Sequence, residues 1–96
     1  MNNTKLDELY NKMITVHEKG QAVFDTEGVP GMLKNEFRNK VSQYDEMYEN
    51  LETMKALSSK PETIDNLVEQ QLEMLNVRIK WEIEWATKAL EYLRII

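Results

Sequence analysis

The chain has 96 residues, 42% of them apolar and 30% charged, with only three glycines and two prolines, which is the composition of one small folded domain and not of a disordered segment. A net charge of −5 disfavours nonspecific DNA binding, because phosphate contacts need clustered lysine and arginine, and we expect no direct nucleic-acid binding. The absence of cysteine excludes disulfides and thiolate metal sites.

The first eight residues lack the basic end and apolar stretch of a secretion signal. No segment supplies the roughly 20 uninterrupted apolar residues that span a bilayer. We therefore expect a cytoplasmic protein without membrane contact. Its size and acidity suit an accessory protein of a phage or other mobile element.

The first predicted helix covers about residues 4–26, with the Thr4 hydroxyl as its N-cap and Asp7 completing a variant of the capping box. Gly20 lowers helix propensity by about 1 kcal/mol relative to alanine, so we expect fraying or a bend there. The segment 27–31 combines two glycines with Pro30 and ends the helix.

The second predicted helix covers about 32–57 and the third about 61–95, with Pro61 in the first turn of the third. At 1.5 Å per residue they are roughly 40 Å and 50 Å long. β-Branched residues never alternate over five or six positions, so no strand is predicted. The fold class is all-α: a three-helix antiparallel bundle or hairpin in a single domain, 1–96, with a long C-terminal helix that we expect dimerisation to complete.

The third helix carries apolar residues on two nearly opposite faces, whereas an ordinary surface helix carries one apolar stripe. One stripe follows the spacing of three and four residues that a helix requires, and it runs through Val68, Leu75 and Ile79. We interpret the second stripe as an interface of a homodimer, made of Leu67, Met74, Val77, Trp81, Trp85, Tyr92 and Ile96. A tryptophan pair one turn apart is also compatible with internal packing, or with one wall of a pocket for a flat ligand.

Two charge patterns add to this interpretation. Arg78 and Glu82 form an i, i+4 pair beside the tryptophans, either solvated or setting the register of an interface. The second helix has Lys34, Arg38 and Lys40 near its N-terminal end, against the macrodipole. An antiparallel neighbour, such as the same helix of a second chain, would offset this cost, and the alternative is that the pattern has no role. A further hypothesis is an acidic partner surface that mimics nucleic acid, formed by Tyr44, Asp45, Glu46, Tyr48, Glu49 and Glu52.

The sequence contains few of the residue patterns that catalysis or metal binding requires. His17 is the single histidine, so neither a His-based metal cage nor a Ser-His-Asp triad is expected, and we interpret it as a surface residue. No glycine-rich phosphate loop is present, since Gly28 and Gly31 bracket a proline. We predict no enzyme, no metal and no cofactor.

Two segments carry a resemblance to a known family. Residues 44–52, YDEMYENLE, and residues 82–93, EIEWATKALEYL, resemble the C-terminal helical domain of PadR-like transcription regulators. The similarity covers at most Leu33 to Leu93. It implies dimerisation through the third helix, but the chain has no N-terminal winged-helix module, so DNA binding does not carry over.

The function expected from the sequence is that of a small non-enzymatic helical protein that self-associates and regulates or inhibits a protein partner. Two alternatives stay open. One is a small-molecule-binding helical dimer with a Trp-lined pocket, and the other is an acidic nucleic-acid mimic that blocks a DNA-binding enzyme.

Overall fold

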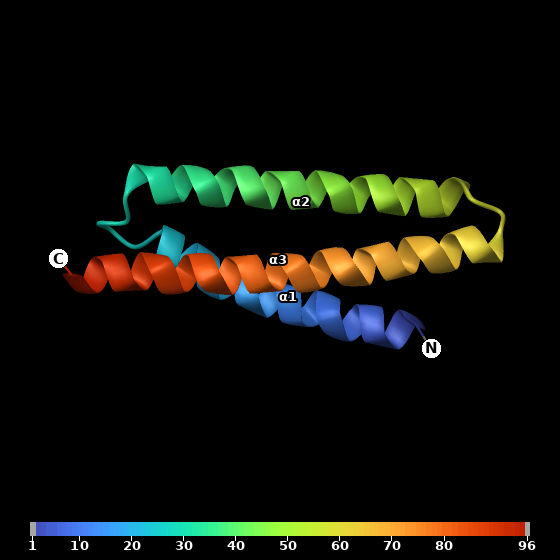
Figure 1. Ribbon diagram of the computed structural model, residues 1–96, viewed down its shortest axis with the longest axis horizontal. Helices are drawn as coiled ribbons and strands as arrows, with labels where there is room; N and C mark the ends of the chain where they lie inside the picture. The colour runs from blue at the N-terminus through green and yellow to red at the C-terminus, as the bar shows by residue number, and fades with distance from the viewer. Residues whose placement is uncertain (1, 96) are drawn as a thin grey trace.

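Three helices make up the fold in the computed structural model, which describes the backbone of residues 2–95 and the side chains of residues 4–94. They are α1 (Asn2–Phe24), α2 (Gly31–Leu57) and α3 (Pro61–Ile95), and the described residues contain no strand. Helices α1 and α3 run in the same direction and α2 runs antiparallel to both (Figure 1). The predicted all-α class with a long C-terminal helix is confirmed.

The ends of α1 differ from the expectation. The helix begins at Asn2, so Thr4 lies inside its first turn and is not the N-cap. It ends at Phe24, two residues early, because the Thr26 backbone N–H bonds the carbonyl of Val23 in a tighter turn (3.0 Å). Gly28 then takes a positive φ of 100°, a conformation that favours glycine and reverses the chain.

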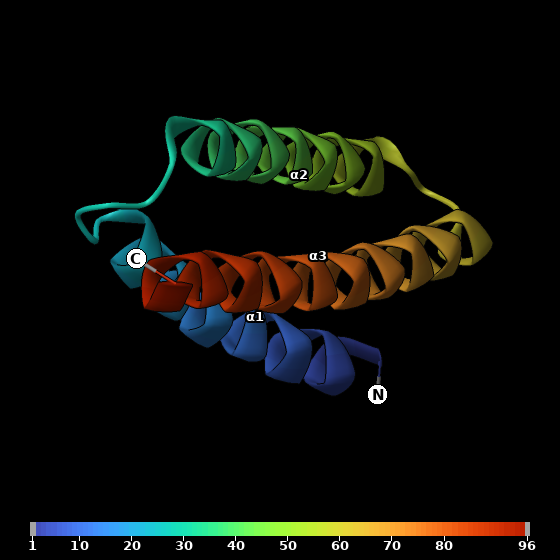
Figure 2. The same cartoon turned by 60° about the vertical axis from the view of Figure 1, so that its left-hand side comes forward.

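Helix α3 lies between the other two helices, as both views show (Figures 1 and 2). Helix α1 packs on the first apolar stripe of α3, and their shared core consists of Leu6, Met13, Val68, Leu75 and Ile79. Helix α2 packs on the second stripe, and their shared core consists of Leu33, Phe37, Tyr44, Leu51, Leu67, Met74, Trp85 and Ala89, together with Val29 of the preceding loop. The two apolar faces of α3 are thus the two sides of one intramolecular core.

This arrangement corrects the interface predicted from the sequence. Leu67, Met74 and Trp85 are only 3%, 6% and 3% exposed in the single chain. They are buried because α2 folds back along α3 and covers them, as an antiparallel helix of similar length can. The second stripe therefore does not stay open as a continuous seam.

Helix α1 continues through Gly20 to Phe24, so it does not end or fray at the glycine. The Gly20 backbone is buried, and a Cβ atom at this position would lie 3.2 Å from Cε2 of Phe37. Phe37 is 2% exposed and packs against Phe24 and Trp85, with ring centroids 5.3 and 4.6 Å away. The glycine thus lets the aromatic core of α2 approach α1 closely.

The basic start of α2 finds its partner within the chain. The ammonium nitrogen of Lys34 and the guanidinium carbon of Arg38 lie 5.3 and 5.2 Å from the ring centroid of Phe24 in α1. Cation–π contacts of this kind contribute about 0.5–1 kcal/mol at exposed sites, which offsets an unfavourable macrodipole term of similar size. Two of the three basic residues at this end of α2, Lys34 and Arg38, therefore have a favourable contact within the chain.

None of the described helices combines the length and the apolarity that a membrane-spanning helix needs.

Candidate functional site

Three polar side chains of α3 point into the middle of the bundle. Gln71, Arg78 and Glu82 are 0%, 4% and 0% exposed, and they follow one another at spacings of seven and four residues. A buried charge is tolerated only when it is paired and hydrogen-bonded. Their partners come from both other helices.

Glu82 is the centre of a network that joins all three helices. Its Oε1 lies 2.7 Å from Nδ1 of His17 in α1, and its Oε2 accepts a hydrogen bond from Nε of Arg78 at 3.2 Å. Arg78 also donates from Nη1 to Oδ1 of Asp45 in α2 at 2.8 Å. Both carboxylate oxygens of Glu82 are thereby occupied, and the chain of contacts His17–Glu82–Arg78–Asp45 crosses the molecule.

The predicted Arg78–Glu82 ion pair is present, but its surroundings differ from both sequence interpretations. It is neither solvated nor turned toward a second chain, because α1 and α2 supply its remaining partners. His17, expected on the surface, is half-buried and stacks on Phe37 with ring centroids 5.7 Å apart and planes 7° apart. The sequence contained a signal for this burial. Arg78 and Glu82 lie between Leu75 and Trp85 at spacings of three and four residues, which places all four on one face of the helix.

A second polar contact lies nearer the α2–α3 turn. Gln71 donates from Nε2 to Oε1 of Glu52 at 2.7 Å, and Glu52 also lies 3.8 Å from Nζ of Lys55. Oε1 of Gln71 has no hydrogen-bond partner among the described residues. The ring of Tyr48 packs beside that of Tyr10 in the same region, with centroids 5.6 Å apart.

The structure separates the two tyrosines of the predicted acidic surface from its four carboxylates. Asp45 pairs with Arg78, Glu52 binds Gln71, and Tyr44 is buried at 8% exposure. Asp45, Glu46 and Glu49 are exposed and line one depression beside α1, and the Glu52 side chain is 42% exposed, whereas Tyr48 is half-buried. The two tyrosines are therefore not part of this accessible surface, and two of its four carboxylates, those of Asp45 and Glu52, already have partners within the chain.

Burial raises the pKa of two tyrosines of α2 above the ordinary value of 10.0. For Tyr44 the nearby guanidinium of Arg78 partly opposes the effect of burial, and for Tyr48 the carboxylate of Glu52 adds to it. A raised pKa in the folded state means that the neutral tyrosines stabilise the fold at pH values below about 10, and that this contribution is lost as the pH rises through the folded-state pKa.

We expect the free energy of unfolding to fall above pH 10 more steeply in the parent than in the double variant Tyr44→Phe, Tyr48→Phe, which has no phenol to ionise at these positions. Urea unfolding at pH 9, 10 and 11 measures the difference. Tyr92→Phe is the matched control, because the Tyr92 ring is 46% exposed. Equal alkaline losses in the parent and the double variant would contradict the assignment.

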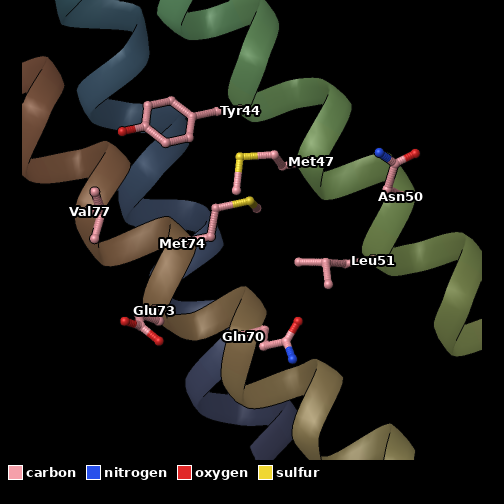
Figure 3. Close-up of a pocket in the computed structure, with 8 residues that line it drawn as sticks. All are labelled: Tyr44, Met47, Asn50, Leu51, Gln70, Glu73, Met74 and Val77. Atoms are coloured by element: carbon pink, nitrogen blue, oxygen red, sulfur yellow. The ribbon is translucent and has the colours of Figure 1, made fainter.

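A groove between α2 and α3 opens on the face that α1 does not cover. Its volume is about 450 Å³. The α2–α3 groove is lined by Tyr44, Met47, Asn50, Leu51, Gln70, Glu73, Met74 and Val77. Figure 3 shows Met47 and Leu51 of α2 facing Met74 of α3 across it.

The rim of this groove exposes apolar side chains to solvent. Met47 and Val77 are 44% and 51% exposed, and Met54, two turns further along α2, is 52% exposed. Methionine side chains are flexible and adapt to different binding partners, which makes such a surface typical of protein association. Of the predicted interface, Val77 is thus the residue that the structure brings to an open apolar face. Met47 and Met54 belong to α2, whereas the apolar interface was predicted on α3 alone.

The two tryptophans have different environments. Trp85 is buried, and its indole N–H donates to the carbonyl of Leu33 at 2.8 Å. Trp81 is half-buried and borders the outer face. Both line a depression of about 150 Å³ with Glu36, Glu84 and Lys88, which is smaller than the roughly 300–1,000 Å³ of typical small-molecule sites.

Tyr92, also predicted at the interface, does not line the groove. Tyr92 is 46% exposed near the end of α3, and Ile96 lies outside the described residues. Within residues 4–94 no group of three His, Cys, Asp or Glu side chains is arranged to hold a metal ion.

Comparison with known proteins gives no relative: no protein-family profile, no curated protein and no solved structure matches this chain.

Proposed function

We propose that this protein is a non-enzymatic helical interaction module that self-associates through the α2–α3 groove and regulates a protein partner. The observation that carries the proposal is the open groove with Met47 and Val77 exposed at its rim, and with Met54 exposed two turns further along α2. A second copy of the same chain is the occupant that we assign to it.

The area that the chain exposes supports pairing. A monomer of 11.4 kDa typically exposes about 5,800 Å², and this chain exposes 6744 Å². The elongated shape of the bundle, 54 × 22 × 15 Å, accounts for such an excess and provides long open faces, on which a standard interface of roughly 800 Å² per partner can form. The resemblance to the dimerisation domain of PadR-like regulators points in the same direction.

A dimer of this kind leaves another surface for the regulated partner. Ile83 and Leu90 of α3 are 48% and 50% exposed beside α1, in a second groove of about 320 Å³. This groove lies between α1 and α3, away from the face assigned to the second copy.

Val77→Glu tests self-association. We expect the dimer to weaken by about 2 kcal/mol or more, which is about 30-fold in Kd, because the substitution places a carboxylate against the apolar groove of the partner. Sedimentation equilibrium over micromolar concentrations measures the change. The fold should persist, since Val77 is half-exposed in the single chain.

Leu90→Glu is the matched control. Leu90 is also an apolar residue of α3 and is equally exposed, but it lies on the α1–α3 side. A dimer that survives Leu90→Glu and dissociates with Val77→Glu supports the proposal. A monomeric parent, or dissociation with Leu90→Glu alone, would overturn it.

A further inference from the structure

Four charged residues surround Trp81 on the same face as the α2–α3 groove. Glu36 and Lys40 come from α2, and Glu84 and Lys88 come from α3. None of them takes part in the ion pairs found among residues 4–94. Both helices thus present one acidic and one basic residue without a charge partner in the described part of the chain.

The contacts between α2 and α3 fix which residues lie at the same height along the bundle. Asp45 meets Arg78, and Leu33 meets Trp85. Since one helix rises as the other descends, Lys40 lies near the level of Trp81. The face therefore has an apolar band around Met47 and Val77, and a charged band nearer the C-terminal end of α3.

We propose that the two-fold axis relating the two protomers runs parallel to the helices. In this dimer, α2 of each protomer lies on α3 of the other. This inference rests on the proposed function and specifies its geometry. A rotation about this axis keeps every residue at the same height along the bundle. Each residue of the face therefore meets partner residues that lie at its own height. The apolar band packs on the partner's apolar band, and the charged bands coincide.

The direction of the side chains makes the opposite charges meet. Side chains on a helix lean toward its N-terminus. Lys40 therefore leans toward the level of the partner's Glu84, and Glu84 leans toward the level of the partner's Lys40. Glu36 and the partner's Lys88 approach each other in the same way.

In the other two-fold arrangement, the four charged residues around Trp81 do not meet opposite charges of the partner. With the axis across the helices, α2 would lie antiparallel on α2 of the partner. If the apolar bands of the two protomers packed on each other in this arrangement, the partner would run in the opposite direction. Lys40 and Glu84 would then lie beside the α2–α3 turn of the partner. Charge complementarity favours the parallel axis, since opposite charges at the rim fix the register of an interface.

Charge reversal in separate protomers tests the arrangement. Lys40→Glu alone places two acidic side chains together at both symmetric contacts, and Glu84→Lys alone places two basic ones together. We expect each homodimer to weaken about tenfold. In a mixture of the two variants the contacts between residues 40 and 84 are again of opposite sign, so a heterodimer should form with the affinity of the parent.

Native mass spectrometry measures the fraction of mixed dimers when one of the two variants is labelled with ¹⁵N. Without preference, half of the dimers are mixed, whereas homodimers about tenfold weaker raise the mixed fraction to about nine-tenths. Because rescue needs residues from two different chains, repacking within one protomer cannot produce it. The preference should also decrease at high salt.

Lys12→Glu and Glu18→Lys form the control pair, because both residues are exposed on α1 and the charge changes are the same. Their mixture should give statistical proportions. Statistical proportions for the Lys40 and Glu84 variants, with a parent that is dimeric and sensitive to Val77→Glu, would overturn the parallel axis and leave the proposed function standing. A monomeric parent would overturn both.

Discussion

Replacing Arg78 by methionine is expected to lower the free energy of unfolding by about 3–5 kcal/mol, because it leaves the carboxylate of Glu82 buried without its positive partner. Arg78 is 4% exposed and Glu82 is 0% exposed, so water does not replace the lost hydrogen bonds. A chain of this size has a total stability of about 5–14 kcal/mol. The loss should therefore be visible as a large fall in the urea midpoint, measured by circular dichroism at a fixed protomer concentration.

Two companion variants separate the buried pair from the surface contact. Asp45→Asn should cost less than about 1 kcal/mol, because the Asp45 side chain is 59% exposed and the contact is screened. Adding Glu82→Met to Arg78→Met removes both charges and should recover part of the loss. If Arg78→Met unfolds within about 1 kcal/mol of the parent, the ion pair does not hold the helices together as described.

Trp85→Ala is expected to destabilise the fold by about 3–5 kcal/mol, whether or not the protein is dimeric. The indole is 3% exposed and fills the space beside Phe37, with ring centroids 4.6 Å apart. Its removal leaves a cavity in the core shared by α2 and α3. Chemical unfolding of the variant gives the size of the effect.

Two controls identify what the indole contributes. Trp85→Phe keeps an aromatic ring but loses the donor to the carbonyl of Leu33, and should cost about 1 kcal/mol beyond the smaller ring volume. Trp81→Ala should affect unfolding less, because Trp81 is only half-buried. Equal losses for the two alanine variants would contradict the separate roles of the tryptophans.

The helices and their order could be predicted from the sequence because the signals are local. Pro61 in a first turn and the Gly-Val-Pro-Gly segment 28–31 mark ends that depend on backbone geometry alone. Spacings of three and four residues likewise assign Leu75 and Ile79 to one face of α3 and Met74 and Val77 to another. The structure has three helices with bounds within about two residues of those expected.

The candidate interface was only partly accessible from the sequence. Periodicity identifies the apolar residues of a helix, but it does not say whether another helix of the same chain covers them. Trp85 and Val77 fall on one stripe by spacing, yet one is 3% and the other 51% exposed. Met47 lies across the groove from Met74 only because the turn at 58–60 brings α2 back along α3.

The sequence by itself determined an all-α chain with three helices, a long last helix apolar on two faces, and the pairing of Arg78 with Glu82, because each of these depends on residues within a few turns of one another. The tertiary structure alone decided that α1 and α2 cover those two faces, that His17 and Asp45 complete the buried pair, and that a groove between α2 and α3 stays open. Contacts between residues 33 or 65 positions apart depend on how the helices pack in three dimensions, which no local pattern records.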